Sequence, residues 1–325
     1  MVLERLLSVS SRHALPFSRR KPPLRSRRQA TLRWHDAAGT ASGLYQRLEV
    51  GRQGADAGRR AGQTVIVADT GDGRLRLVTQ GDHAAFAADL LALWPELTDA
   101  TTAPGPGGES SLRALVLRAT RLHDNGWAEL DAAPPLTREG LPHDFLSLPR
   151  NERLELWRRG VERYAASDPE VAALILEHAI YVLGLSRDIQ AEDLDSWRDW
   201  RDALHEELGW QDSALPRAAY PWLQAADALS LQVCARWSGD SEVELPAAAD
   251  RRRRSPMRAR LLEAGESAGG GEELRLDPFP LVGASTLHLS CRFVPRRRYA
   301  STADLSAELA AARWLRVPCR IAPLA

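Results

Sequence analysis

Four predicted helices each carry an ionisable side chain on an otherwise apolar face, and this pattern constrains the fold of the 325-residue chain most strongly. At 100° per residue, His83, His123, His178 and Asp227 each fall among aliphatic or aromatic neighbours on their own helix. A buried carboxylate such as Asp227 needs a cation beside it, and we find no arginine on the inner faces of these helices. We therefore predict that the four helices pack around a shared metal ion.

A His-Asp doublet ends one of these helices, in the segment Leu122-His123-Asp124-Asn125-Gly126-Trp127. Adjacent residues cannot share one helix face, but at a fraying helix end both side chains can converge on one point. A single buried histidine is more often a hydrogen-bonded core residue than a ligand, so the prediction depends on the whole set. Nitrogen and oxygen ligands together suit a divalent ion of Mn, Fe, Zn, Co or Ni, in one or two copies. The predicted metal ligands are His83, His123, Asp124, His178 and Asp227.

Apolar residues recur at helical spacing through much of the chain and predict a mainly α-helical fold. A hairpin is predicted around Thr70-Gly71-Asp72-Gly73. Alternating apolar residues predict strands at 286–294 and 315–321, with Pro318 favouring an edge position for the last strand. We expect the hairpin and the C-terminal strands to form one small antiparallel sheet beside a helical bundle. The predicted helices span residues 83–94, 111–124, 151–166, 169–185, 191–208 and about 221–236, with Pro221 in the first turn of the last one.

Composition shifts divide the chain into four predicted parts. Residues 1–60 are rich in arginine and poor in acidic residues, which favours a disordered extension over an organelle-targeting segment. Residues 61–237 form the predicted helical, metal-binding core. Residues 238–272 contain four consecutive arginines and three consecutive glycines and are predicted to be a flexible insertion. Residues 273–325 are a predicted β-rich appendage that packs on the core.

Overall composition is typical of a soluble globular protein, and the partner that we expect is a small, phosphorylated substrate. Hydrophobic residues make up 44% and charged residues 26% of the chain, and the formal net charge is zero. This balance gives no electrostatic reason to expect nucleic acid or a membrane surface as a partner. Three widely spaced cysteines favour a reducing compartment over a disulfide framework, and we predict a cytoplasmic protein of unknown oligomeric state.

The order His, His-Asp, His, Asp on successive helices resembles the HD superfamily of metal-dependent phosphohydrolases. There the doublet closes one helix and the last Asp lies in a later one, here in Ala226-Asp227-Ala228-Leu229-Ser230. From about residue 65 onward the chain more closely resembles an uncharacterised bacterial family, domain of unknown function 3891 (DUF3891). The segments Val78 to His83, Leu122 to Trp127, and Leu156-Trp157-Arg158-Arg159-Gly160 carry that resemblance. The resemblance implies an HD-like helical core with His83, the doublet and Asp227 as ligands, and His178 as a middle ligand.

The leading functional prediction is hydrolysis of a phosphate ester or related bond by a metal-activated water, with Asp124 and His178 as catalytic residues. One alternative is an HD-type di-iron oxygenase with six protein ligands, the sixth being His143 from the Pro-rich loop 132–149. The other two interpretations of His143 are a lid residue that contacts substrate and a solvated loop residue, and the loop favours the latter. A further alternative is a non-catalytic scaffold that binds metal or a small molecule, since no Gly-rich phosphate loop, G-x-S-x-G or C-x-x-C motif is present.

Overall fold

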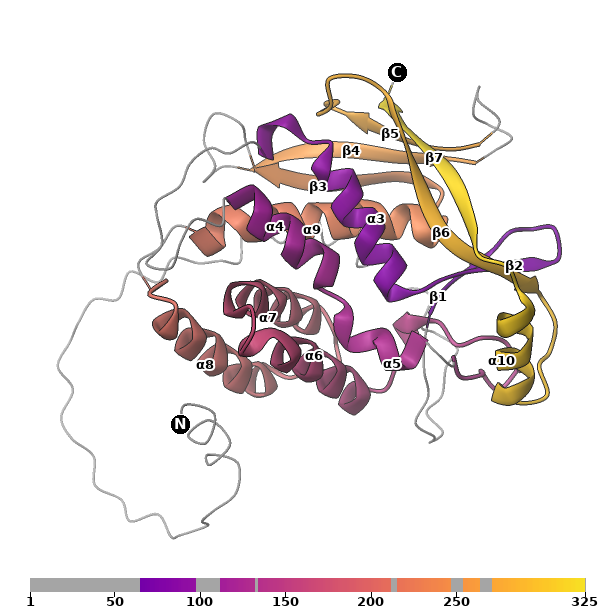
Figure 1. Cartoon of the computed structure of the whole chain (residues 1–325), viewed down its shortest axis with the longest axis horizontal. Coiled ribbons are helices and arrows are strands. Elements are labelled where there is room, and N and C mark those ends of the chain that lie inside the picture. The colour runs from indigo at the N-terminus through magenta and orange to yellow at the C-terminus, as the bar shows by residue number, and fades with distance from the viewer. Residues whose placement is uncertain are drawn as a thin grey trace, which may run out of the picture. The chain divides into compact units, whose positions relative to one another are not determined.

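The computed structural model describes residues 65–97, 112–131, 134–211, 215–246, 254–263 and 271–324. Of these residues 51% are helical and 24% lie in strands, and the strands form one curled, seven-stranded mixed sheet (Figure 1). The prediction of a mainly α-helical, or all-α, bundle with a small sheet is therefore wrong. The extension predicted for residues 1–60 lies outside the described residues.

The sheet joins strands from both ends of the described chain in the order β1-β2-β6-β7-β5-β4-β3. Neighbouring strands are antiparallel except β5 and β7, which are parallel. The predicted hairpin forms β1 and β2, and β2 continues onto β6 with Arg76 opposite Phe293. The strands are β1 (Ile66–Asp69), β2 (Arg74–Val78), β3 (Gly239–Pro246), β4 (Arg254–Leu262), β5 (Glu272–Asp277), β6 (Ser285–Pro295) and β7 (Leu315–Pro323).

The size of the sheet differs from the prediction because β3 and β4 lie in the segment expected to be a flexible insertion. Both strands alternate apolar and charged residues, as in Val243 between Glu242 and Glu244, although the segment is polar overall. The buried residues are Val243 and Leu245 of β3 and Met257, Ala259 and Leu261 of β4. Pro318 does not mark an edge either, because β7 lies between β6 and β5. Pairing with β5 begins one residue later, at Cys319, so the missing N–H of Pro318 faces no β5 partner.

All six predicted helices are present, and two of them lie directly on the sheet. Helix α3 contacts β6, and α9 contacts β3 and β4. Helix α4 packs against α3, α9 and α7, while α6 and α8 pack on α7 (Figure 1). Pro221 is a buried interior residue of α9 and not a first-turn residue, so packing outweighs the local cost of proline here. The helices are α3 (Gln80–Ala92), α4 (Leu112–Leu122), α5 (Ala128–Asp131), α6 (Arg150–Ala165), α7 (Pro169–Gly184), α8 (Ala191–Glu207), α9 (Leu215–Cys234) and α10 (Thr302–Ala311).

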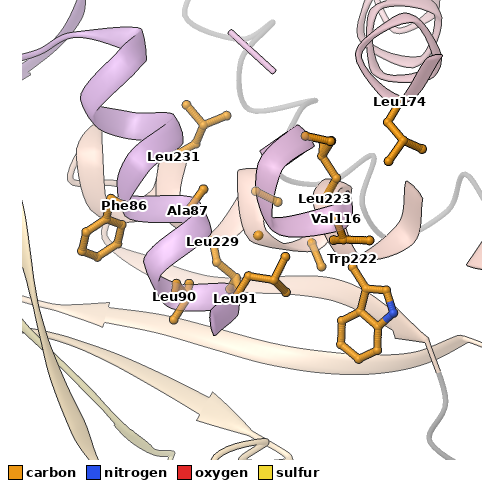
Figure 2. Close-up of a cluster of buried hydrophobic side chains, with 14 of the residues drawn as sticks. Phe86, Ala87, Leu90, Leu91, Val116, Leu174, Trp222, Leu223, Leu229 and Leu231 are labelled. Atoms are coloured by element: carbon orange, nitrogen blue, oxygen red, sulfur yellow. The ribbon is translucent and has the colours of Figure 1, made fainter. Parts of the chain in front are cut away.

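The main hydrophobic core fills the space between these helices and the sheet. Phe86, Leu90 and Leu91 of α3 and Leu229 of α9 all belong to this core and are buried (Figure 2). Burial of each such side chain contributes about 1.5–3 kcal/mol to stability. Because α3, α4, α7 and α9 share this core, the ionisable residues on their inner faces are held in fixed positions. No helix in the described part of the chain combines the length and apolar character needed to cross a membrane.

A buried ion pair also ties the sheet to the end of α9. The Arg76 side chain on β2 is 1% exposed and donates to both carboxylate oxygens of Glu272 on β5, at 2.8 and 2.7 Å. The same guanidinium donates to the carbonyl oxygens of Val233 and Cys234, which are the last residues of α9. Carbonyl groups at a helix C-terminus have no partner within the helix, so Arg76 satisfies them and fixes α9 against the sheet.

Candidate metal centre

Three structural elements bring the candidate ligands together at one point in the helical layer. His83 lies in the first turns of α3, whose N-cap Thr79 accepts a hydrogen bond from the backbone N–H of Asp82. His123 and Asp124 follow the last residue of α4 and precede the 3-10 helix Asn125–Trp127. Asp227 lies within α9. All four side chains are buried, and one potential ligand atom from each lies within 4.8 Å of the others.

The separations between these atoms match those of ligands around one metal ion. The Nε2 atom of His83 lies 2.9 Å from Asp227 Oδ1 and 3.6 Å from Asp124 Oδ2. The Nε2 atom of His123 lies 3.1 Å from Asp124 Oδ2 and 3.3 Å from Asp227 Oδ1. Ligands about 2.1 Å from a metal are about 3.0 Å apart at right angles and about 3.4 Å apart in a tetrahedron. The two histidines and two carboxylates therefore fit a single divalent ion.

The hydrogen bonds of the two imidazoles leave both Nε2 atoms facing the carboxylates. His123 Nδ1 lies 2.7 Å from the carbonyl oxygen of Thr120, which can only accept, so Nδ1 carries the proton. The Ser230 hydroxyl donates to the carbonyl oxygen of Asp227 at 2.9 Å and accepts from His83 Nδ1 at 2.9 Å. Metal-bound histidines commonly donate their second N–H in this way. His123 Nε2 is buried and has no hydrogen-bond partner in the described part of the chain.

The charges of the group call for a cation. Burial by itself lowers the pKa of His123, but the adjacent Asp124 and Asp227 carboxylates outweigh burial and raise that pKa well above its usual value. Burial favours a higher pKa for Asp227, yet the adjacent His123, His83 and His178 imidazoles hold it well below the usual value. A proton or a metal ion can supply the positive charge that two neighbouring carboxylates require.

His178 lies beside this group and is not one of its four members. Its Nε2 atom is 3.6 Å from Asp227 Oδ2, and its ring packs edge-on against His123, with the ring centres 4.9 Å apart. Its Nδ1 atom is 3.4 Å from the Tyr220 hydroxyl. Burial lowers the pKa of His178 to about 4, so the imidazole is neutral near pH 7. Its assignment as a metal ligand stays a prediction.

His143 is not one of the four residues of this group and lies in the loop before the short helix Phe145–Ser147. Its backbone N–H donates to the carbonyl oxygen of Pro135, and its side chain is only partly buried. Its assignment as the sixth ligand of a di-iron centre stays a prediction.

A cavity of about 100 Å³ opens beside the cluster and contains Asp124, Asp227 and His178 in its wall. Sequence reasoning missed the buried Arg153 of α6, because that helix was not among the four searched for inward-facing charges. The signal was present, since Arg153 shares the helical spacing of Leu156, Trp157 and Gly160. The rest of the wall is mainly aromatic and aliphatic and consists of Gln80, Trp127, Phe145, Leu146, Arg153, Trp157, Val182, Leu183, Leu185, Ser186 and Leu231.

The residues after the doublet fix it against α6. The Asn125 side chain donates to the carbonyl oxygens of Leu122 at 2.8 Å and Gly160 at 3.0 Å. A Cβ atom on Gly126 would lie 2.2 Å from the carbonyl oxygen of Leu156, so only glycine allows this close approach. The turn that carries His123 and Asp124 is thus held by backbone contacts with α6.

Comparisons with known proteins give a family and no activity. The chain matches no curated protein and no solved structure. The relationship to the HD superfamily therefore stays a prediction. A family model matches residues 65–296, which include the doublet, the other ligands of the cluster and six of the seven strands. The chain thus belongs to the family described as protein of unknown function, DUF3891.

Proposed function

We propose that this protein is a metal-dependent hydrolase that cleaves a phosphate ester or a related bond in a small molecule. One observation carries the proposal: the Nε2 atoms of two buried histidines face two buried carboxylates while their Nδ1 atoms are engaged elsewhere. This arrangement is unfavourable without a cation, and the adjoining cavity offers room for a substrate.

Each residue has a definite role in the proposed site. His83, His123, Asp124 and Asp227 hold the ion, with Thr120 and Ser230 orienting the two imidazoles. A bound divalent ion lowers the pKa of a coordinated water to about 7 and polarises a phosphoryl oxygen. Asp124, Asp227 and His178 line the cavity, so they are the members of the site that a bound substrate would meet. The neutral His178 imidazole is suited to hydrogen bond with the attacking water.

Metal analysis of the purified chain tests the first step of this proposal. We expect one or two equivalents of Mn, Fe, Zn, Co or Ni in the unmodified protein and almost none in His123→Gln. His205→Gln is the matched control. His205 is a partly buried histidine on α8 that lies outside the cluster. Metal content near zero in the unmodified chain, unchanged in His123→Gln, would refute a metal centre.

Assays on the metal-loaded protein test the reaction class. Hydrolysis of phosphomonoesters or phosphodiesters that depends on the added ion and is lost in His178→Gln supports the proposal. Iron-dependent oxygen consumption would instead favour an oxygenase. Ligand-dependent thermal stabilisation without turnover across a broad ester panel would favour a non-catalytic binding scaffold.

A further inference from the structure

A buried arginine lies in the wall of the same cavity and is incompletely satisfied. Arg153 of α6 is 8% exposed. Its Nη1 donates to the Ser186 hydroxyl at 3.2 Å, and its Nη2 lies 2.5 Å from each carboxylate oxygen of Asp188. Its Nε–H is buried and has no hydrogen-bond partner within the described ranges. A buried donor of a charged group without a partner is costly, so an acceptor that reaches this N–H would be stabilising.

A second residue of the cavity wall also carries an unpartnered donor. The indole Nε1–H of Trp127 is buried and has no partner in the described structure, and Trp127 is 5% exposed. Apolar side chains such as Phe145 and Trp157 make up much of the remaining wall. Two unused N–H donors, one of them on a cation, in a largely apolar wall favour an oxyanion as the occupant.

The Arg153 guanidinium lies about two helical turns from the metal cluster along α7. His178 contacts Asp227 from within α7, whereas the Arg153 guanidinium reaches Ser186, just beyond the last turn of that helix. Ser186 continues the helical path, because its N–H donates to the carbonyl oxygen of Leu183. Eight residues at a rise of 1.5 Å place the two points roughly 12 Å apart along the helix. An anion at Arg153 is therefore separate from the group that reacts at the metal.

We propose that Arg153 is a substrate-binding residue that takes a carboxylate or phosphate group at the end of the cavity away from the metal cluster. The substrate class is then a small anionic molecule whose charged group is separated from the reacting bond by about two helical turns. Asp188 holds the guanidinium in place, and because its side chain is 48% exposed, water screens its charge more than that of Arg153. The anion site at Arg153 does not depend on the proposed function. Only the statement that the substrate reacts at the metal cluster rests on it.

Calorimetric titration with simple probes tests the anion site in the metal-free chain. We expect hexanoate to bind at least about tenfold more tightly than hexanamide, which has the same chain length and no charge. Arg153→Gln should abolish this preference, and Arg153→Lys should keep part of it because the charge remains without the planar fork. Asp188→Asn should strengthen hexanoate binding several-fold by removing the competing carboxylate. Arg158→Gln is the matched control, since Arg158 lies on the same helix but pairs with Glu155 and Glu162 at the surface.

The outcomes distinguish this proposal from the proposed function. Equal binding of hexanoate and hexanamide, or an unchanged preference in Arg153→Gln, would overturn the anion site. If Arg153→Gln does not fold, a hexanoate affinity unaltered in both Arg153→Lys and Asp188→Asn overturns it equally. Hexylphosphonate can bind at Arg153 as well, so only the difference between its affinities with and without Mn reports on the metal centre. An Arg153-dependent hexanoate preference together with metal-independent phosphonate binding would leave the anion site in place and refute the hydrolase.

Discussion

Replacement of Gly126 by alanine should both destabilise the protein and disrupt the candidate metal centre. The added Cβ would lie 2.2 Å from the carbonyl oxygen of Leu156 and 3.1 Å from the amide nitrogen of Gly160. A carbon and a carbonyl oxygen normally stay about 3.3 Å apart, so the doublet turn and α6 must separate by about 1 Å. Such overpacking costs about 1–3 kcal/mol, and weakening the Asn125 hydrogen bond to Gly160 adds about 1 kcal/mol. We expect a total loss of about 3 kcal/mol in the free energy of unfolding.

Chemical and thermal denaturation of three glycine variants provides the measurement. A loss of about 3 kcal/mol corresponds to a fall in Tm of roughly 6–12 °C for a domain of this size. Gly184→Ala in α7 is the matched control, because its nearest neighbour would be a Leu194 methyl at 3.5 Å, and alanine favours a helix. Gly160→Ala, with contacts of 3.4–3.6 Å, should cost less than about 1 kcal/mol. A Gly126→Ala variant as stable as Gly184→Ala, with unchanged metal content, would show that this backbone contact does not position the doublet.

Three further predictions concern the hydrogen bonds and protons around the centre. Ser230→Ala should weaken metal binding about 10–100-fold, because it removes the hydroxyl that holds His83 Nδ1. Ser196→Ala removes a similar hydroxyl-to-carbonyl hydrogen bond on α8 and should leave metal affinity unchanged. Equal metal affinities in the two variants would contradict the role of Ser230. Because the pKa of His123 is raised, metal binding near pH 7 should release about one proton. Calorimetry in buffers of different ionisation enthalpy measures the number of protons released. A number near zero would count against His123 as a ligand. Burial raises the pKa of Asp131 to about 8, so the native state keeps a proton that the unfolded chain loses above about pH 4. Unfolding free energy should therefore fall as pH rises from about 4 to 8, and Asp131→Asn should flatten that slope; parallel pH profiles would refute this.

The helices and the candidate site are largely predictable because their signals are local. Helical spacing places His83, His123, His178 and Asp227 on inward faces, and the structure buries all four. The position of a doublet at a helix end correctly indicates that both side chains reach one point, since His123 and Asp124 leave α4 together. Helical periodicity also gives the existence of each helix, while packing decides its ends, as the interior position of Pro221 in α9 shows.

The sheet is less predictable because its stability comes from residues far apart in the chain. Strands β3 and β4 carry an alternating pattern, but charged residues on the outer face hide it in the overall composition. The central place of β7 depends on parallel pairing with β5, which brings Cys319 beside Glu272. No periodicity within either segment specifies that neighbour.

Residue order alone establishes which side chains face inward, because the turn of a helix and the pleat of a strand are set by the backbone within a few residues. Tertiary structure alone decides which inward-facing groups become neighbours. His83 meets Asp227 at a sequence separation of 144, and Arg76 meets Glu272 at a separation of 196. Arg153 likewise reaches the cavity of the metal cluster only through the packing of α6 on α7. Contacts of this kind depend on how whole helices and strands fill a shared core, and no local pattern encodes that arrangement.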